Sequence, residues 1–448
     1  MSEEYAISTI DSLISEYNLN GMPIEVDFRK IVHWMRGGDQ LTHFIHPYPA
    51  KLLPHIASFF LKGLHNSSKV VLDPFSGSGT VALEGSIEGY TPLVADSNPF
   101  AILLTKVKTT PYDIQKLELH FNQIIECMDS NRESATISII NSHLWFSTKH
   151  KKNLESLYSI IKETIDEPEK DFFLVCFSLL TKKLSYADPA LSVPVRIKTK
   201  DRFSQVTNDR IVNRLNWLEN EASVKEEFIK IVQSNIERVK NTNETYPIRE
   251  AAKTVGIDAR QLFSSMEKSI KLPDDSIPLI ITSPPYGSAQ KYIRATSLSL
   301  NWLEFAKPSD LKILESRSIG REHLKSEKID FDSSNLPEQY KSLLKKINNI
   351  NPKRALITFK YLQEMDEVIK ELSRVMMKNG KAVFVIGNNE VCGETLRNDM
   401  YIIYCFEKYN VKLELFLVDD IKSRGLMTKR NRAASVISRE SVLLFSKE

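Results

Sequence analysis

A run with two adjacent prolines carries the clearest chemistry in this sequence. The apolar stretch 277–281 is followed by Thr282 and then by Ser283-Pro284-Pro285-Tyr286. The Ser283 hydroxyl and a carbonyl oxygen near Pro284 can accept hydrogen bonds from an amino group, and prolines remove competing backbone donors and fix the turn. Tyr286 offers a face on which a planar ring can stack. The run is therefore suited to holding an amino-bearing ring, whereas a plain turn or a polyproline ligand is the competing interpretation.

A glycine-rich turn follows an earlier apolar run. Lys69-Val70-Val71-Leu72 leads into Asp73-Pro74-Phe75-Ser76-Gly77-Ser78-Gly79-Thr80 and then into a helical pattern. In an open α/β sheet, ligands bind at the carboxyl ends of strands, and glycines let the backbone approach them closely. Asp73 is placed to meet a charged group such as an ammonium. No Lys follows Gly79 and Ala82 replaces a third glycine, so P-loop and dinucleotide fingerprints are excluded.

Other polar residues flank this turn. Asp96 ends a second strand-like run and can accept hydrogen bonds from ribose hydroxyls. Asp96 or Asn98 can also cap the following helix, a role that does not exclude ligand binding. Upstream, Tyr48 and Lys51 lie in an aromatic, proline-rich cluster before the helical run 53–64.

Together these segments resemble the amino-directed (N4-cytosine/N6-adenine) S-adenosylmethionine-dependent DNA methyltransferases. The string 73–80 resembles their motif I, 44–51 their motif X, 256–262 their third motif, and 283–286 their catalytic tetrapeptide of the Ser-Pro-Pro-Tyr type. The resemblance implies S-adenosyl-L-methionine as cofactor. The cofactor-binding residues it implies are Tyr48, Lys51, Asp73, Phe75, Ser76, Gly77, Gly79, Thr80, Asp96, Asn98 and Asp258.

The resemblance also implies catalysis by Ser283, Pro284, Pro285 and Tyr286 on a base extruded from the duplex. Serine at the first position is typical of N4-cytosine enzymes, whereas Asp or Asn is more typical of adenine enzymes. We therefore expect methylation of cytosine N4 in duplex DNA, with adenine N6 as the alternative. Methylation of cytosine C5 is not expected, because it needs a cysteine nucleophile, usually after proline, and no cysteine here follows one.

The spacing of apolar residues predicts the elements that position these motifs. Short β-rich runs lie in 41–107 and 252–448, and helical spacing dominates 110–250. We expect an α/β fold: a doubly wound, mostly parallel, Rossmann-like methyltransferase sheet with a large, mainly helical insert. The expected divisions are an N-terminal extension (1–40), a cofactor-binding half (41–109), the helical insert as candidate target-recognition region (110–250), and a catalytic half (251–448).

Two basic stretches are candidates for DNA contact. Residues 182–214 hold eight Lys/Arg and three Asp, and 422–439 hold six Lys/Arg and no acid. The alternative interpretation of each stretch is a solvated surface. Residues 302–350 are a second candidate for target recognition. Phosphate contacts position a protein and base contacts specify the sequence. The residues chosen for DNA binding are Arg196, Lys198, Lys200, Arg424, Lys429, Arg430 and Arg432.

Composition sets outer limits on these expectations. The 448-residue chain has a formal net charge of +3, which does not by itself demonstrate a nucleic-acid partner. No apolar run is long enough to cross a membrane and the N-terminus is acidic, so we expect a cytoplasmic protein. The spacing of Cys127, Cys176, Cys392 and Cys405 favours buried thiols over a metal site or disulfides. A cognate restriction endonuclease is a possible partner, and an RNA or tRNA amino-methyltransferase or a non-catalytic DNA-binding subunit are the competing functions.

Overall fold

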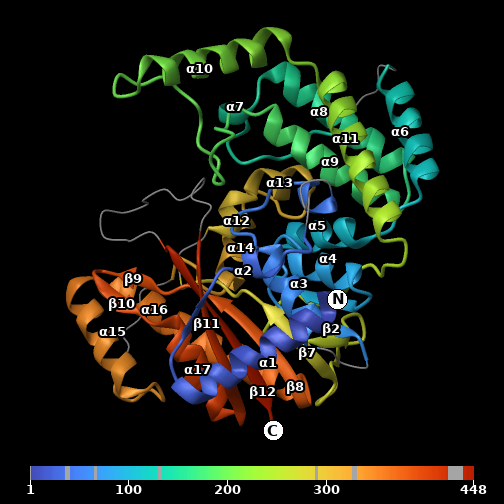
Figure 1. Ribbon diagram of the computed structural model, residues 1–448. Helices are drawn as coiled ribbons and strands as arrows, with labels where there is room; N and C mark the ends of the chain where they lie inside the picture. The colour runs from blue at the N-terminus through green and yellow to red at the C-terminus, as the bar shows by residue number, and fades with distance from the viewer. Residues whose placement is uncertain are drawn as a thin grey trace.

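The computed structural model describes residues 2–35, 41–64, 68–129, 134–287, 291–324, 330–421 and 437–448. An eight-stranded sheet runs through the lower part of the molecule in the order β1-β11-β12-β8-β7-β2-β3-β4 (Figure 1). Its strands are β1 (Ile24–Val26), β2 (Val70–Asp73), β3 (Thr91–Ala95), β4 (Lys253–Gly256), β7 (Ile277–Thr282), β8 (Met376–Ile386), β11 (Val411–Asp420) and β12 (Arg439–Lys447). Two small hairpins pair β5 (Phe263–Ser265) with β6 (Ile270–Lys271) and β9 (Asn389–Val391) with β10 (Glu394–Leu396).

Most neighbouring strands in the large sheet are parallel. The antiparallel exception is β12, which lies between β8 and β11 and pairs antiparallel with both. From β2 the chain moves outward to β3 and β4, and then returns to β7 on the other side of β2. The direction of winding therefore changes between β2 and β7, and ligands of open α/β sheets bind at such a switch point.

Helices cover both faces of the sheet. One face packs against α1 (Ser2–Asn20), α2 (Phe28–Ile31), α3 (Pro54–Gly63) and α4 (Thr80–Ile87). The other packs against α15 (Glu338–Ile350), α16 (Pro352–Val375) and α17 (Asn398–Lys408). Because strands such as β7 are buried along their whole length, they read as continuous apolar runs in the sequence. The predicted mixed α/β, mostly parallel sheet is confirmed.

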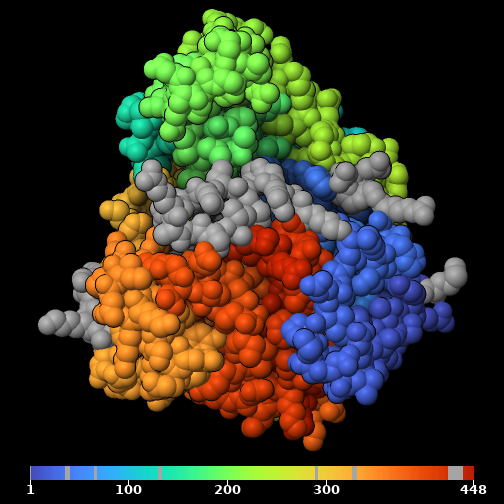
Figure 2. Space-filling view, turned by 60° about the vertical axis from the view of Figure 1, so that its left-hand side comes forward, coloured from blue at the N-terminus to red at the C-terminus, as the bar shows by residue number. Residues whose placement is uncertain are grey.

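The helical region forms a lobe of its own above the sheet (Figures 1 and 2). It contains α6 (Ile114–Met128), α7 (Ser142–Trp145), α8 (Thr148–Thr164), α9 (Glu169–Lys183), α10 (Gln205–Asn216), the π-helical turn η3 (Trp217–Glu221) and α11 (Val224–Thr245). Its core also takes side chains from α5 (Pro99–Thr109) and α13 (Ser297–Trp302). Trp302 of α13 meets Phe146 and Phe177 edge-on, with ring centroids 5.3 and 5.6 Å apart. A single apolar core thus joins the helical lobe to the helices beside the sheet.

Other features bear on the composition. Cys176 and Cys405 are buried as expected, but Cys127 and Cys392 are partly exposed. In the described parts of the chain, no helix combines the length and apolar character needed to span a membrane. The segment 302–350 contributes α14 (Leu311–Arg317) and α15, and α12 (Tyr292–Ala295) precedes it.

Candidate active site

The glycine turn after β2 is tied to the end of the neighbouring strand. The amide of Gly77 donates a 2.8 Å hydrogen bond to Asp96 Oδ2, and the amide of Ser76 donates to the Ala95 carbonyl at 3.0 Å. Gly77 and Gly79 adopt positive φ angles of 47° and 74°, which glycine tolerates best. These bonds bring motif I and the acidic end of β3 to one site.

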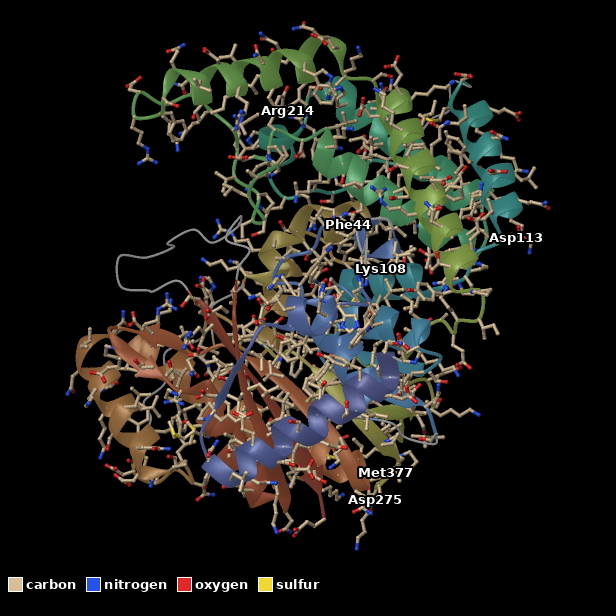
Figure 3. The ribbon with its side chains drawn as sticks, in the orientation of Figure 1. Phe44, Lys108, Asp113, Arg214, Asp275 and Met377 are labelled. Atoms are coloured by element: carbon tan, nitrogen blue, oxygen red, sulfur yellow. The ribbon has the colours of Figure 1, made fainter. Side chains whose placement is uncertain are left out.

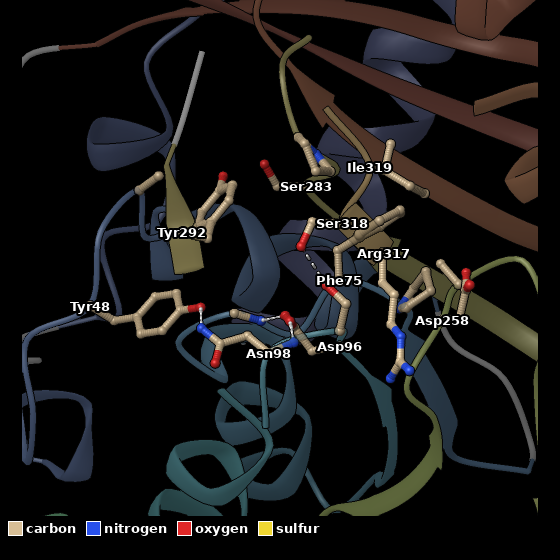
Figure 4. A pocket seen from close by; sticks show the side chains of 16 residues that line it. Tyr48, Phe75, Asp96, Asn98, Asp258, Ser283, Tyr292, Arg317, Ser318 and Ile319 are labelled. Carbon is tan, nitrogen blue, oxygen red and sulfur yellow. Dashed lines mark hydrogen bonds between the residues drawn. The ribbon is translucent and has the colours of Figure 1, made fainter. Parts of the chain in front are cut away.

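A pocket opens over this turn (Figure 4). About 670 Å³ of empty space lies within it, counting the solvent open at its mouth. Figure 4 shows Asp96 and Asn98 on one side of it and Asp258 with Arg317 on another. The lining residues are Tyr48, Ala50, Pro74, Phe75, Gly77, Asp96, Ser97, Asn98, Asp258, Ala259, Ser283, Pro285, Tyr292, Arg317, Ser318 and Ile319.

The structure brings six of the proposed cofactor-binding residues into this lining: Tyr48, Phe75, Gly77, Asp96, Asn98 and Asp258. Asn98 also caps α5 through Phe100 N at 3.1 Å, and its amide donates to the Tyr48 hydroxyl at 3.0 Å. Asp258 is paired with Arg260, at 2.7 Å between Oδ2 and Nη2. The other five, Lys51, Asp73, Ser76, Gly79 and Thr80, are not among the lining residues.

Three of these five residues support the site or lie beside it. The Asp73 carboxylate accepts hydrogen bonds from the Thr282 hydroxyl at 2.7 Å and the Phe75 amide at 3.1 Å. Lys51 donates to the His43 carbonyl at 3.0 Å and faces a neighbouring cavity. A Cβ on Gly79 would lie 2.9 Å from Thr105 Cα. Gly79 therefore permits close packing of α4 on α5, and its role in cofactor binding stays a prediction.

Burial raises the pKa of two carboxyl groups here. It raises the pKa of Asp73 to about 7, because the loss of hydration outweighs two hydrogen bonds that favour the charged form. It raises the pKa of Asp96 to about 6 against hydrogen bonds from the amides of Asn98 and Gly77. Asp96 is therefore charged near neutral pH, and each of its oxygens has a lone pair left for a ligand donor.

Part of the pocket wall has no counterpart in the sequence motifs. Tyr292 lies at the start of α12, and Arg317, Ser318 and Ile319 lie at and beyond the end of α14. The Ser318 hydroxyl lies 3.4 Å from that of Ser97, so this wall closes against the end of β3. Nothing in the local sequence marked these residues, because no glycine turn or strand end precedes them.

The Ser-Pro-Pro-Tyr turn follows β7, the strand that pairs with β2. The Ser283 hydroxyl lies 3.1 Å from the Tyr286 hydroxyl, and Tyr286 donates to Glu440 Oε1 at 2.8 Å. The Pro285 carbonyl accepts a 2.9 Å hydrogen bond from the Tyr361 hydroxyl, which holds the turn against α16. Pro284 is buried. Glu440, the second residue of β12, was not among the predicted site residues.

A second cavity adjoins the first. About 1810 Å³ of empty space lies within it, counting open solvent, and four residues line both cavities: Tyr48, Ala50, Ser283 and Tyr292. Its other walls come from 44–54, from Arg29 of α2 and from Tyr286, Asp419, Ile421, Ile437 and Glu440. Figure 3 shows Phe44, one of these lining residues, between the helical lobe above and the sheet below. Ser283 therefore stands where the two cavities meet.

The proposed DNA-binding residues fall into two groups. Arg196 and Lys198 are exposed and Lys200 is half-buried, on the chain between α9 and α10. The Arg196 guanidinium lies over the Tyr186 ring at 5.3 Å, and the Lys200 ammonium over Phe203 at 5.0 Å. Arg424, Lys429, Arg430 and Arg432 lie outside the described residues. Within the described residues, no three His, Cys, Asp or Glu side chains are grouped to hold a metal ion.

Comparison with known proteins bears on the family. Residues 50–239 match the model of the D12 class N6 adenine-specific DNA methyltransferase family. The chain is 26% identical to the type II methyltransferase M.MvaI of Kocuria varians over 430 residues, covering 91% of this chain and 90% of that protein. It is 41% identical to the type II methyltransferase M.MjaII of Methanocaldococcus jannaschii over 77 residues, or 17% of this chain and 14% of the relative.

A solved structure shows a weaker likeness. TTHA0409 of Thermus thermophilus, assigned as a DNA modification methylase, matches at 18% identity over 42% of this chain and 50% of that chain. The TM-score of 0.20 is too low to show that the two proteins share a fold. The sequence matches, like the glycine turn and the Ser-Pro-Pro-Tyr turn, support the resemblance of the chain to the amino-directed S-adenosylmethionine-dependent DNA methyltransferases.

Proposed function

We propose that this protein is a cytoplasmic, site-specific methyltransferase that transfers a methyl group from S-adenosylmethionine to N4 of cytosine in duplex DNA. The observation that carries this proposal is the position of Ser283 at the junction of the two cavities. The pocket over the glycine turn would hold the methyl donor, and the larger cavity would receive a base turned out of the duplex. Ser283 would meet the reacting nitrogen between them.

The pocket fits such a cofactor. Asp96 offers carboxylate oxygens to the ribose hydroxyls. Asp258 and the ring of Phe75 line the same pocket and would contact the adenine. When bound, the cofactor supplies a methyl group on a positively charged sulfur. The residues of the chain orient it, keep water out, and hold the amino group of the base through acceptors at Ser283. Orientation of this kind supplies a large part of the acceleration in bimolecular reactions.

The choice of base rests on Ser283. In the resembled family, serine at this position is typical of cytosine N4 enzymes. Adenine N6 is the second candidate, because the matching family model is described as adenine-specific. That match ends at residue 239, before the catalytic turn, so it does not include the residue that would face the base. We retain cytosine N4 as the proposal.

The helical lobe and its basic chain would contact the DNA. Arg196, Lys198 and Lys200 supply positive charge there beside Tyr186 and Phe203, which favours contact with phosphates and bases. The domain divisions at residues 40, 109 and 250 and the role of 110–250 in target recognition are part of this proposal. Type II methyltransferases among the relatives favour a restriction-modification system, in which a cognate endonuclease would be the partner.

Methylated-base analysis tests the proposal. DNA from an unmodified host expressing the protein should contain N4-methylcytosine, as measured by mass spectrometry of its nucleosides, and DNA from a host expressing Ser283→Ala should contain much less. Purified protein should transfer tritiated methyl groups to duplex DNA and not to total RNA. N6-methyladenine would replace the base assignment, and methylation of RNA alone would overturn the DNA substrate. No transfer at all would leave a non-catalytic DNA-binding role.

A further inference from the structure

The carboxyl group of Glu440 lies at the end of a short hydrogen-bond chain that starts at the reacting site. Ser283 Oγ is 3.1 Å from the Tyr286 hydroxyl, which donates to Glu440 Oε1 at 2.8 Å. Both Glu440 and Tyr286 line the larger cavity. A tyrosine hydroxyl has one proton, and here Tyr286 donates it in the hydrogen bond to Glu440. The Tyr286 oxygen must then accept the proton of Ser283.

This polarity has a direct effect on Ser283. Because the Ser283 proton is engaged in the hydrogen bond to Tyr286, the Ser283 oxygen has only lone pairs to present toward the cavities. An amino group on a ring has two N–H donors and a delocalised lone pair. An acceptor-only Ser283 oxygen binds one of those protons, whereas a serine that donated into the cavity would compete for the nitrogen lone pair that must attack.

We propose that Glu440 is a positioning residue that fixes Ser283 as an acceptor through Tyr286 and receives the proton released in methyl transfer. The proposal rests on the proposed function. As the amino nitrogen bonds to the methyl carbon, the sulfur–carbon bond breaks and its electron pair stays on sulfur. The nitrogen then gives one proton to Ser283 Oγ, Ser283 gives its proton to Tyr286, and Tyr286 gives its own to Glu440, which ends as a neutral carboxylic acid.

The surroundings of Glu440 suit this task. Asp419 of β11 lies directly opposite it in the antiparallel ladder, and like charges at such positions repel. Burial raises the pKa of Glu440 above its usual value, the charge of Asp419 adds to the rise, and the Tyr286 hydrogen bond and Arg29 of α2 oppose it. Burial also raises the pKa of the Tyr286 hydroxyl well above its usual value, so its proton stays in place at neutral pH.

Single-turnover methyl transfer at saturating cofactor and DNA, measured across pH, is the test. The wild-type rate should rise with pH as Glu440 loses its proton. Glu440→Gln should lower the rate by about 10² and remove that rise, since general acid–base contributions are of this order. Glu440→Asp, which keeps the carboxylate, should restore part of the rate and the rise. Cofactor affinity and DNA affinity should stay near wild type in both variants.

Variants of two charged residues beside Glu440 distinguish proton acceptance by Glu440 from a purely structural role in holding Tyr286. Asp419→Asn should move the pH-dependent rise to lower pH, and Arg29→Gln should move it to higher pH, because each changes the charge beside Glu440. Asp420→Asn is the matched control: it follows Asp419 on the same strand, is exposed and pairs with Arg439 at 2.8 Å. It should change neither rate nor profile.

The outcomes are distinct. An inactive wild-type protein overturns the proposed function, not the role of Glu440 within it. An active wild type whose profile is the same in Glu440→Gln overturns the relay. If Glu440→Gln does not fold, the Asp419→Asn and Arg29→Gln profiles decide: shifts in opposite directions support the relay, and profiles identical to wild type overturn it.

Discussion

Asp96 Oδ2 accepts the backbone amide of Gly77 at 2.8 Å, so the residue proposed to bind the cofactor ribose also holds the glycine turn. Replacing it with Ala removes a charge-assisted acceptor, which should cost on the order of 1.5 to 3 kcal/mol of cofactor binding. Calorimetric titration with S-adenosylmethionine measures this loss. The pKa of Asp96 is about 6, so wild-type affinity should fall as pH drops from 7 to 5. Wild-type affinity in the folded variant would contradict the role.

Ser283→Ala and Tyr286→Ala should lose turnover while keeping cofactor affinity, because the proposed function has both side chains act on the base. The expected fall in methyl-transfer rate is about 10² or more. Radiolabelled methyl transfer measures the rate, and calorimetry measures cofactor affinity. Loss of cofactor binding in either variant without unfolding would show that the turn serves the cofactor pocket instead.

Asp73→Asn should stabilise the protein at high pH. Asn Oδ1 can keep both hydrogen bonds that Asp73 Oδ1 accepts, from Thr282 and Phe75. The pKa of Asp73 is raised from 3.8 to about 7 in the folded state, so folding takes up a proton between these values and wild-type stability falls as pH rises through them. At about 1.4 kcal/mol per pKa unit, the advantage of Asn at pH 8 is on the order of a few kcal/mol.

Thermal unfolding without cofactor at pH 5 and pH 8 measures this effect. The variant should melt above wild type at pH 8, with a smaller difference at pH 5, where the wild-type carboxyl is largely protonated. The exposed Asp201, changed to Asn, is the matched control and should leave the difference between the two pH values unchanged. A variant less stable than wild type at pH 8 would show that the charge of Asp73 favours folding.

The two glycines of the turn should differ in what they disturb. A Cβ on Gly79 would crowd Thr105, while one on Gly77 would meet Tyr48 at an ordinary 3.6 Å. Gly79→Ala should therefore lower stability by roughly 1 to 3 kcal/mol through overpacking, in addition to strain at positive φ. Gly77→Ala carries the strain at positive φ without this crowding, so it should lower stability less than Gly79→Ala does, and because Gly77 lines the pocket it should also weaken cofactor binding. Thermal melts and calorimetry on both variants check the contrast.

Local patterns predicted the strand ends of this site well. Buried parallel strands give continuous apolar runs, so β2, β3 and β7 and the residues that follow them could be placed from the sequence. Asp96, Asp258 and Ser283 then meet because parallel strands end at the same edge of a sheet. Each of these residues lines the pocket.

Residues set by tertiary contacts could not be found in this way. Arg317 ends α14 and Ile319 follows it in a segment with no motif. This segment meets the chain just after β3, where the Ser318 and Ser97 hydroxyls lie 3.4 Å apart. Glu440 lies in β12, and its contact with Tyr286 depends on the antiparallel placement of β12 between β8 and β11. No local pattern states that register.

The two basic stretches should separate by their effect on DNA binding. If 422–439 holds phosphates, Arg430→Ala should weaken binding by similar factors on all sequences and flatten the log–log salt dependence by about one unit. Arg196 lies over the Tyr186 ring in the helical lobe, where it is exposed. If it contacts base edges, Arg196→Ala should weaken cognate binding selectively, with the salt slope nearly unchanged. Affinities for cognate and scrambled duplexes at several salt concentrations measure both. An unchanged salt slope for Arg430→Ala would show that this residue does not contact phosphates. Equal losses of affinity on both duplexes for Arg196→Ala would show that Arg196 contacts the DNA backbone and not the base edges.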